Sequence, residues 1–153
     1  MALSDALVQI IEERATEIAQ KWYRETRQTP YVPSLNSISE DDALEMATNV
    51  YRRLSHWMTP SGEAEIKETY QRFGESLFYR GFRMEEVVMI LILIKRYLWL
   101  HLLEQGLMTT NLDVYQALDV NNKVVLYFDR AIYFALIGFR EARAANRKAI
   151  AGA

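Results

Sequence analysis

The sequence predicts an all-α protein, a single antiparallel bundle of five to seven helices that ends in a long C-terminal helix. Apolar residues recur at spacings of three and four along most of the chain, as they do on one side of an amphipathic helix. Only six glycines and three prolines occur among its 153 residues, a composition that permits long helices. One stretch, residues 83–105, is more apolar than the others and predicts the helix around which the bundle is built.

Within that stretch, the eight residues from Val87 to Ile94 are apolar on every side. A helix of this kind is either surrounded by other helices or lies in a membrane. Lys95 and Arg96 end the run, whereas a membrane span needs about 20 apolar residues. We therefore expect a central helix that other helices cover on all sides, and no membrane segment.

The first helix is expected to begin at Ser4, whose side chain can cap it, and to run to about Gln28. Pro30 and Pro33 end this helix, because proline lacks a backbone N–H and pushes the preceding residue towards extended geometry. The loop over residues 29–38 is the longest break in the pattern. The apolar stripe of the helix consists of Leu7, Ile11, Ala15, Ile18 and Trp22.

Ser39 begins a second helix, which ends before the helix-breaking sequence Pro60-Ser61-Gly62. A third helix follows over about residues 63–79, with Gly74 inside it. A glycine within a helix costs about 1 kcal/mol relative to alanine, so we expect a close helix crossing at Gly74. Gly81 then takes the capping position after the third helix.

The last helical stretch begins at Asn111, and the sequence leaves open whether it is broken near Asn121. From Lys123 onward it carries two apolar seams, whereas one seam is enough to dock a helix on its own domain. A second copy of the chain is the simplest partner for the second seam, so we expect a homodimer, in parallel or antiparallel geometry. The first seam is Val124, Tyr127, Ala131, Phe134 and Gly138; the second is Val125, Phe128, Ile132, Ala135 and Phe139.

The composition changes after Phe139, where the chain becomes polar and rich in alanine. These residues have high helix propensity but almost no side chain that could form a core. We therefore expect one domain over residues 1–153. Residues 141–153 are expected to be a helical exit segment that leads towards an output domain absent from the chain.

The overall composition argues against several classes of function. A net charge of −2 provides no basic surface for broad nucleic-acid binding. The chain has no cysteine, which excludes disulfides and thiolate catalysis and fits a reducing compartment. Asp5, Glu12 and Glu13 interrupt any secretory signal pattern. We expect a cytoplasmic protein that binds neither nucleic acid nor a membrane.

Between Val8 and Arg143 the chain resembles the N-terminal domain of RsbRD-type proteins, the RsbT co-antagonists. The resemblance is carried by apolar spacing and by five stretches: Ile10-Ile-Glu-Glu-Arg14, Ile18-Ala-Gln-Lys-Trp22-Tyr23-Arg24, Phe73-Gly74-Glu75, Gly81-Phe-Arg-Met-Glu-Glu-Val-Val88 and Leu98-Trp99. It implies a helical sensory or regulatory module, usually dimeric, in front of a STAS phosphoacceptor domain, a histidine kinase or a helix-turn-helix regulator. Related RsbR N-terminal domains have a globin-like fold without haem, which implies a globin-like bundle here.

His101 provides a candidate ligand site in the central helix, near Tyr97 and Trp99. A histidine in an apolar helix of a globin-like fold raises the question of haem ligation. A buried histidine that hydrogen-bonds within the core is the commoner explanation, so we expect no cofactor. The alternative is a sensor that binds haem or a small apolar ligand through these three residues.

No sequence pattern predicts an enzyme or a metal site. The chain has neither a Glu-x-x-His motif nor a histidine pair at helical spacing. It also lacks a glycine-rich phosphate loop, and no nucleophile stands out with a base and an orienting group. We therefore predict a non-enzymatic sensory or regulatory module of a bacterial signal-transduction protein. Its dimer interface would pass a signal to an output domain or partner.

Overall fold

A computed structural model describes residues 3–152. These residues form seven α-helices and one 3₁₀-helix, with no strand among them. The predicted all-α bundle with a long C-terminal helix is therefore confirmed. The elements are α1 (Leu3–Glu13), α2 (Ala15–Thr26), η1 (Pro33–Ser37), α3 (Glu40–Arg52), α4 (Leu54–Trp57), α5 (Pro60–Tyr79), α6 (Met84–Glu104) and α7 (Asn111–Ala151).

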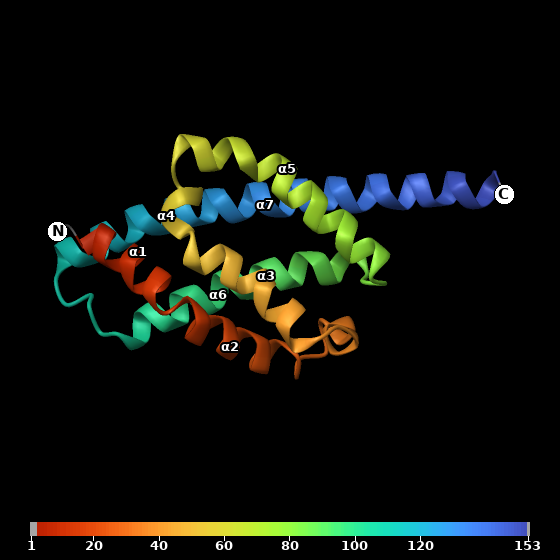
Figure 1. Ribbon diagram of the computed structural model, residues 1–153. Coiled ribbons are helices and arrows are strands. Elements are labelled where there is room, and N and C mark those ends of the chain that lie inside the picture. Colours follow the sequence, from red (N-terminus) through yellow and green to blue (C-terminus); the bar gives the residue numbers. More distant parts are fainter. Residues whose placement is uncertain (1–2, 153) are drawn as a thin grey trace.

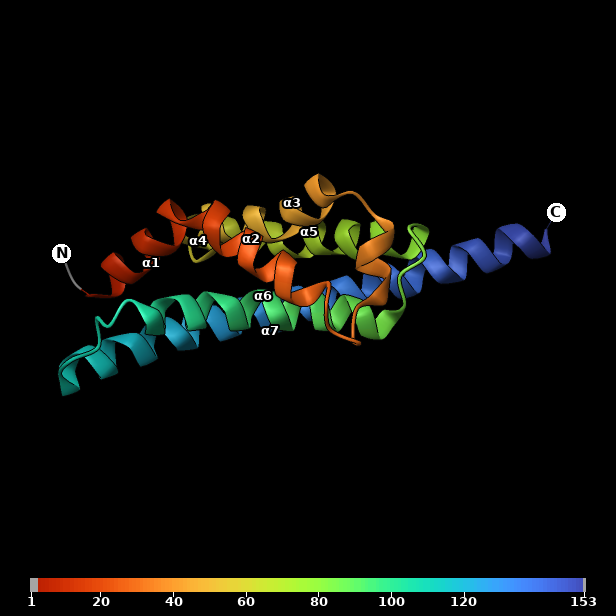
Figure 2. The same cartoon turned by 90° about the horizontal axis from the view of Figure 1, so that it is seen from below.

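The helices form two layers. Helices α6 and α7 lie side by side and antiparallel in one layer, and α1 to α5 cover one side of it (Figures 1 and 2). Successive long segments run in opposite directions, so α5 and α7 are parallel to each other (Figure 1). The blue end of α7 projects beyond the other helices in both views. The core lies between the two layers and contains Trp22, Tyr51 and Phe128, all fully buried.

Two helices expected to be continuous are each divided at an arginine. Arg14, with φ −103° and ψ 17°, separates α1 from α2, and Arg53, with φ −116° and ψ 27°, separates α3 from α4. At the second break, the Ser55 N–H donates to the Glu12 carboxylate of α1 over 3.2 Å. This distant partner satisfies a donor that the first turn of a helix leaves free. The expected Ser4 cap was also wrong, because Ser4 lies inside α1.

The start of α5 differs from the prediction, whereas its end agrees with it. Thr59 caps α5 by accepting a hydrogen bond from the Gly62 N–H over 3.1 Å. Pro60 therefore begins α5 rather than breaking a helix, since the first helical position needs no N–H donor. At the other end Gly81 adopts a left-handed φ of +86°. The N–H groups of Gly81 and Phe82 donate back to Phe78 and Leu77, each over 3.0 Å, as in a Schellman motif.

The predicted close crossing at Gly74 is present, and α7 is the partner helix. A Cβ atom at Gly74 would overlap the carbonyl oxygen of Ala135. The contact is reciprocal, because a Cβ atom at Gly138 would overlap the carbonyl oxygen of Gln71. The backbones of α5 and α7 therefore touch directly, without side chains between them.

Hydrogen bonds to the Glu86 carboxylate connect the η1 segment to the start of α6. This carboxylate is fully buried, and it accepts hydrogen bonds from the Ser34 N–H and hydroxyl over 2.9 and 2.8 Å. It also accepts the Arg83 N–H over 3.0 Å, which closes a capping box at the first turn of α6. Burial alone raises the pKa of Glu86, but the hydrogen bonds from Arg83 and Ser34 outweigh it and hold the pKa below the ordinary value of 4.5.

We predict that Gly74→Ala lowers the free energy of unfolding by about 1–3 kcal/mol, because the added methyl group overpacks the α5–α7 crossing. Helix propensity alone predicts the opposite, a gain of about 1 kcal/mol. Urea denaturation would measure the difference. Ser76→Ala, at an exposed position of α5, is the matched control and should change stability by less than about 0.5 kcal/mol. A more stable Gly74→Ala protein would contradict the backbone contact.

We predict that Glu86→Gln costs about 1–3 kcal/mol of stability at neutral pH, because it weakens a buried network of charge-assisted hydrogen bonds. The pKa of Glu86 is lower in the folded than in the unfolded chain, so its contribution is complete above the unfolded pKa. It is lost as the pH falls through the folded pKa. The stability difference between wild type and variant, measured by denaturation across acidic pH, should therefore shrink.

The control is Glu85→Gln, since Glu85 is an exposed neighbour of Glu86. Its effect should stay below about 1 kcal/mol. A difference between wild type and Glu86→Gln that does not change with pH would contradict this role of the carboxylate.

Candidate protein-interaction surface

Helix α6 is buried on one side only, which corrects the expectation that other helices surround it. Its inward side carries Ile90, Ile94 and Leu98, all fully buried. The opposite side is also apolar but only half-buried, and Leu103 is 61% exposed. Half-buried residues on that side include Val88, Met89, Ile92, Leu93, Trp99 and Leu100. The long apolar run therefore serves two surfaces, one in the core and one at the exterior.

Helix α7 carries an outward apolar stripe at alternating spacings of three and four. The stripe begins with Tyr115 and Leu118, which are 72% and 52% exposed. Such alternation over three heptads is typical of a helix that packs against further helices. The stripe consists of Tyr115, Leu118, Asn122, Val125, Asp129, Ile132 and Leu136.

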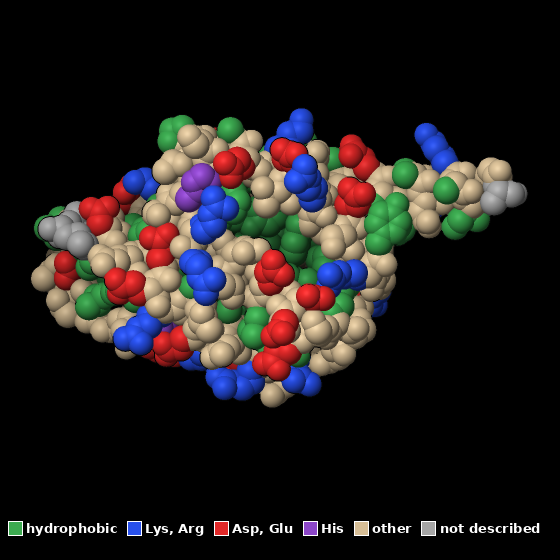
Figure 3. Space-filling view, viewed as in Figure 1, with side chains coloured by type: hydrophobic (Ala, Val, Ile, Leu, Met, Phe, Trp, Pro, Cys, Tyr) green, Lys and Arg blue, Asp and Glu red, His purple; other side chains and the backbone are tan. Residues whose placement is uncertain are grey.

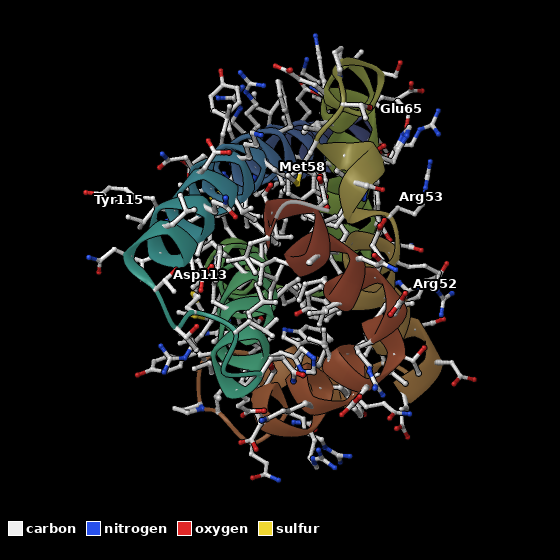
Figure 4. The ribbon with its side chains drawn as sticks, turned by 90° about the vertical axis from the view of Figure 1, so that its left-hand side faces the viewer. Arg52, Arg53, Met58, Glu65, Asp113 and Tyr115 are labelled. Atoms are coloured by element: carbon white, nitrogen blue, oxygen red, sulfur yellow. The ribbon has the colours of Figure 1, made fainter. Side chains whose placement is uncertain are left out.

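The two outward sides belong to the same layer of the molecule. Together they form what we call the outer face: the α7 stripe together with Met89, Ile92, Arg96, Trp99 and Leu103 of α6. No described helix covers this side of the α6/α7 layer (Figure 2). Tyr115 points away from the bundle on this side, whereas Arg52, Arg53 and Glu65 lie towards the opposite side (Figure 4). At one end, Met84 of α6 and Tyr133 of α7 line an apolar groove of about 280 Å³.

Two charged residues lie within the outer face, Arg96 on α6 and Asp129 on α7. Both are exposed, and neither forms an ion pair with another described residue. The opposite side of the molecule is different in character, because acidic and basic side chains are mixed across it (Figure 3). An uncovered, largely apolar face is typical of a protein-interaction site.

The second seam predicted on α7 does not form one surface. Phe128 and Ala135 are fully buried and Phe139 is 4% exposed, so the chain's own helices already cover these three residues. Only Val125 and Ile132 reach the exterior, and both belong to the outer face. The expected homodimer stays a prediction, but a second copy would meet Asp129 and Leu136 in place of Phe128 and Ala135.

The structure does not bring the three predicted ligand-site residues together. His101 is 7% exposed and faces the core, where its ring nitrogen lies 3.5 Å from the Gln105 amide. Tyr97 is on the same side of α6, one turn away. Trp99 is on the outer face, because two residues along a helix turn the side chain by about 200°. Ligand binding by these residues, haem included, stays a prediction.

A hydrogen bond between two buried tyrosines, which residue spacing did not predict, joins α5 to α7. The hydroxyl groups of Tyr70 and Tyr127 share a hydrogen bond, and Trp57 packs against Tyr127 with ring centroids 5.7 Å apart. Burial raises the pKa of both phenols above the ordinary value of 10. Both groups therefore stay neutral, and their bond helps to hold the two helices together.

The C-terminal part of α7 continues beyond the bundle. Ala142 is the last buried residue, and the helix extends a further nine residues to Ala151. This segment projects clear of the other helices (Figure 1). The question of a break near Asn121, which the sequence left open, is answered by α7, which is continuous from Asn111 to Ala151. One rigid element thus links the outer face to the projecting segment.

Within residues 3–152, no group of three potential metal ligands occurs. No helix in that same range combines the length and the hydropathy needed to cross a membrane.

The fold and the outer face together define a class of protein: a helical module that presents an interaction surface and a projecting terminal helix. A family model described as the RsbT co-antagonist protein rsbRD N-terminal domain matches residues 16–149. The chain therefore belongs to the RsbRD N-terminal domain family, which confirms the resemblance noted from its sequence. It is accordingly a regulatory domain of the stressosome type. No curated protein and no solved structure gives a significant match, so the globin-like fold stays a prediction.

We predict that Phe128→Ala lowers the free energy of unfolding by about 3–5 kcal/mol, because it leaves a cavity in the core. Leu118→Ala, on the outer face, should change the stability of the isolated chain by less than about 0.5 kcal/mol. Denaturation at low protein concentration would compare the two variants. Similar losses for both would contradict the division of α7 into an inner and an outer side.

Proposed function

We propose that this domain is a non-enzymatic sensory module that forms a homodimer through its outer face. It passes a signal along α7 to an output domain or partner protein in the bacterial cytoplasm. The observation that carries the proposal is the placement of an uncovered apolar stripe on the helix that projects from the bundle. STAS domains, histidine kinases and helix-turn-helix regulators are the output classes that the resemblance to RsbRD-type proteins implies. The proposal involves no catalytic residue and no cofactor.

The two charged residues of the outer face favour one arrangement of the two copies. With a two-fold axis parallel to the helices, α6 of one copy faces α7 of the other. A two-fold axis makes every contact reciprocal, so Arg96 of each copy can meet Asp129 of the other. Met84 lies beside residues 133–140 of α7, which places Arg96 and Asp129 about 7 Å apart along the axis at 1.5 Å per residue.

This arrangement also explains how a signal would leave the domain. Both α7 helices run in the same direction, so the two projecting segments leave the dimer at the same end. A shift between two packings of the α6/α7 layers would move both segments together. Such a switch requires that the two packings differ by only a few kcal/mol. A polar residue such as Asn122 within the stripe limits stability and favours one register.

A charge swap tests the interface. We predict that Asp129→Arg weakens dimerisation, because it places two arginines opposite each other at both contacts. The double variant Asp129→Arg with Arg96→Asp should restore dimerisation, since each pair again joins opposite charges. Analytical ultracentrifugation over a range of concentrations would give the dissociation constants. We expect a loss of about tenfold for the single variant and recovery in the double variant.

The matched control is Asp41→Arg, an exposed change on α3 that should leave the dimer unchanged. Circular dichroism would confirm that each variant keeps its helix content. A wild-type protein that stays monomeric at high concentration would refute the proposed dimer. Failure of the double variant to recover would refute the arrangement of the two copies but not dimerisation itself.

A further inference from the structure

A groove separates α3 from α5 on the side of the molecule opposite the outer face. The two helices diverge from α4 (Figure 1), and the surface between them is hollowed, with hydrophobic side chains at its floor (Figure 3). The groove has a volume of about 260 Å³, close to the lower end of the range for small-molecule sites. Neither the core nor the outer face uses this space.

The floor of the groove is apolar and adaptable. Met46 of α3 and Phe73 of α5 are half-buried, and Leu77 beside them is 1% exposed. Methionine is flexible and polarizable and adjusts to ligands of different shape. Phe73 makes an edge contact with Tyr70, with ring centroids 5.7 Å apart. A flat apolar group on this floor would therefore contact side chains that belong to the core.

The walls of the groove leave one acidic group unpaired. Arg80 of α5 pairs with Asp42 of α3 over 3.1 Å, and Arg72 pairs with Glu68 on its own helix. Glu45 also lines the groove, and it forms no ion pair with any described residue. Because Arg80 pairs with Asp42 and Arg72 pairs with Glu68 just outside the groove, the charged group left over beside the apolar floor is the Glu45 carboxylate. The Ser76 hydroxyl lies on the α5 wall and can accept a hydrogen bond.

The groove is mechanically connected to the projecting helix. Phe73 and Leu77 flank Gly74, where the α5 backbone touches the α7 backbone at Ala135. No side chain between the two helices can absorb a displacement of α5. A ligand that moves α3 and α5 apart therefore acts on α7 at Ala135, seven residues before Ala142, the last buried residue of that helix.

We infer that this groove binds a small organic cation with a flat apolar body, such as an arylalkyl amine, and that it is the input site of the domain. The apolar body lies on Met46, Phe73 and Leu77, and the ammonium group faces Glu45. The proposal that this groove binds a cation does not depend on the proposed function. Only the last step, the effect of binding on the projecting segment of α7, rests on that function.

Titration of the full chain with phenethylamine tests the site, with phenylpropanoate as an anion of matched size. Two-dimensional NMR would follow the backbone amides of α3 and α5. We expect shifts confined to the groove and binding of the amine at least fivefold tighter than that of the anion. Glu45→Gln should reduce amine affinity about three- to fivefold. Glu40→Gln, an exposed change outside the groove, is the matched control.

A second variant blocks the groove without altering the core. Ser76→Trp places a large side chain on the exposed wall and should reduce binding at least tenfold while the helix content is kept. Absence of shifts in α3 and α5 at millimolar amine would overturn the site. Equal binding of the amine and the anion, or unchanged affinity in Glu45→Gln, would overturn the assignment of a cation.

Hydrogen exchange of residues 143–152 tests the coupling to α7 separately. We expect the amine to change exchange in this segment of the wild-type protein. The Asp129→Arg variant should still bind the amine, because Asp129 is far from the groove. Binding without any change in exchange would support the site but overturn its role as an input. A wild-type protein that binds the amine but stays monomeric at high concentration would count against the proposed function alone.

Discussion

The direct backbone contact between α5 and α7 is the constraint on which the rest of the structure depends. Because Gly74 and Gly138 carry no side chain, the two helices approach until the carbonyl groups of Ala135 and Gln71 occupy the space of the missing Cβ atoms. The Tyr70–Tyr127 hydrogen bond lies along the same interface. Helix α5 is thereby fixed to α7, and the Gly81 turn directs the chain back into α6 on the same layer. The remaining helices then close over the inner side.

Because of that constraint, α7 has one apolar side that packs in the core and a second apolar side that faces outward. Its inner side packs on α5 and α6, whereas its outer stripe from Tyr115 to Leu136 has no covering helix within the described chain. Exposed apolar surface costs about 25 cal/mol per Å² relative to burial, so a stripe of this length favours association. The projecting segment then connects any change at the outer face to residues beyond the bundle. The groove between α3 and α5 reaches the same helix from the opposite side through α5.

Local sequence signals predicted the features that depend on neighbouring residues. Ser39 and Gly81 were recognised as helix boundaries because caps and left-handed turns require particular residue types. Gly74 indicated a helix crossing because glycine is otherwise unfavourable within a helix. The break at Arg53 could not be predicted, since the carboxylate that accepts the Ser55 N–H after the break belongs to Glu12, 43 residues before Ser55. Pro60 was assigned to the wrong side of a boundary because proline is compatible both with ending a helix and with starting one.

The sequence by itself determined the all-α class, the family and the presence of two apolar seams on the last helix. These features follow from the spacing of apolar residues along the chain, which the sequence gives directly. Only the tertiary structure decided which residues face outward. The predicted seam and the outer stripe share Val125 and Ile132, but the stripe continues through Asp129 and Leu136 rather than Phe128 and Ala135. A step of one residue turns the side chain by about 100°, and spacing alone does not fix that rotation. The angles at which α5 and α6 pack on α7 fix it, since they determine which side of α7 the core covers.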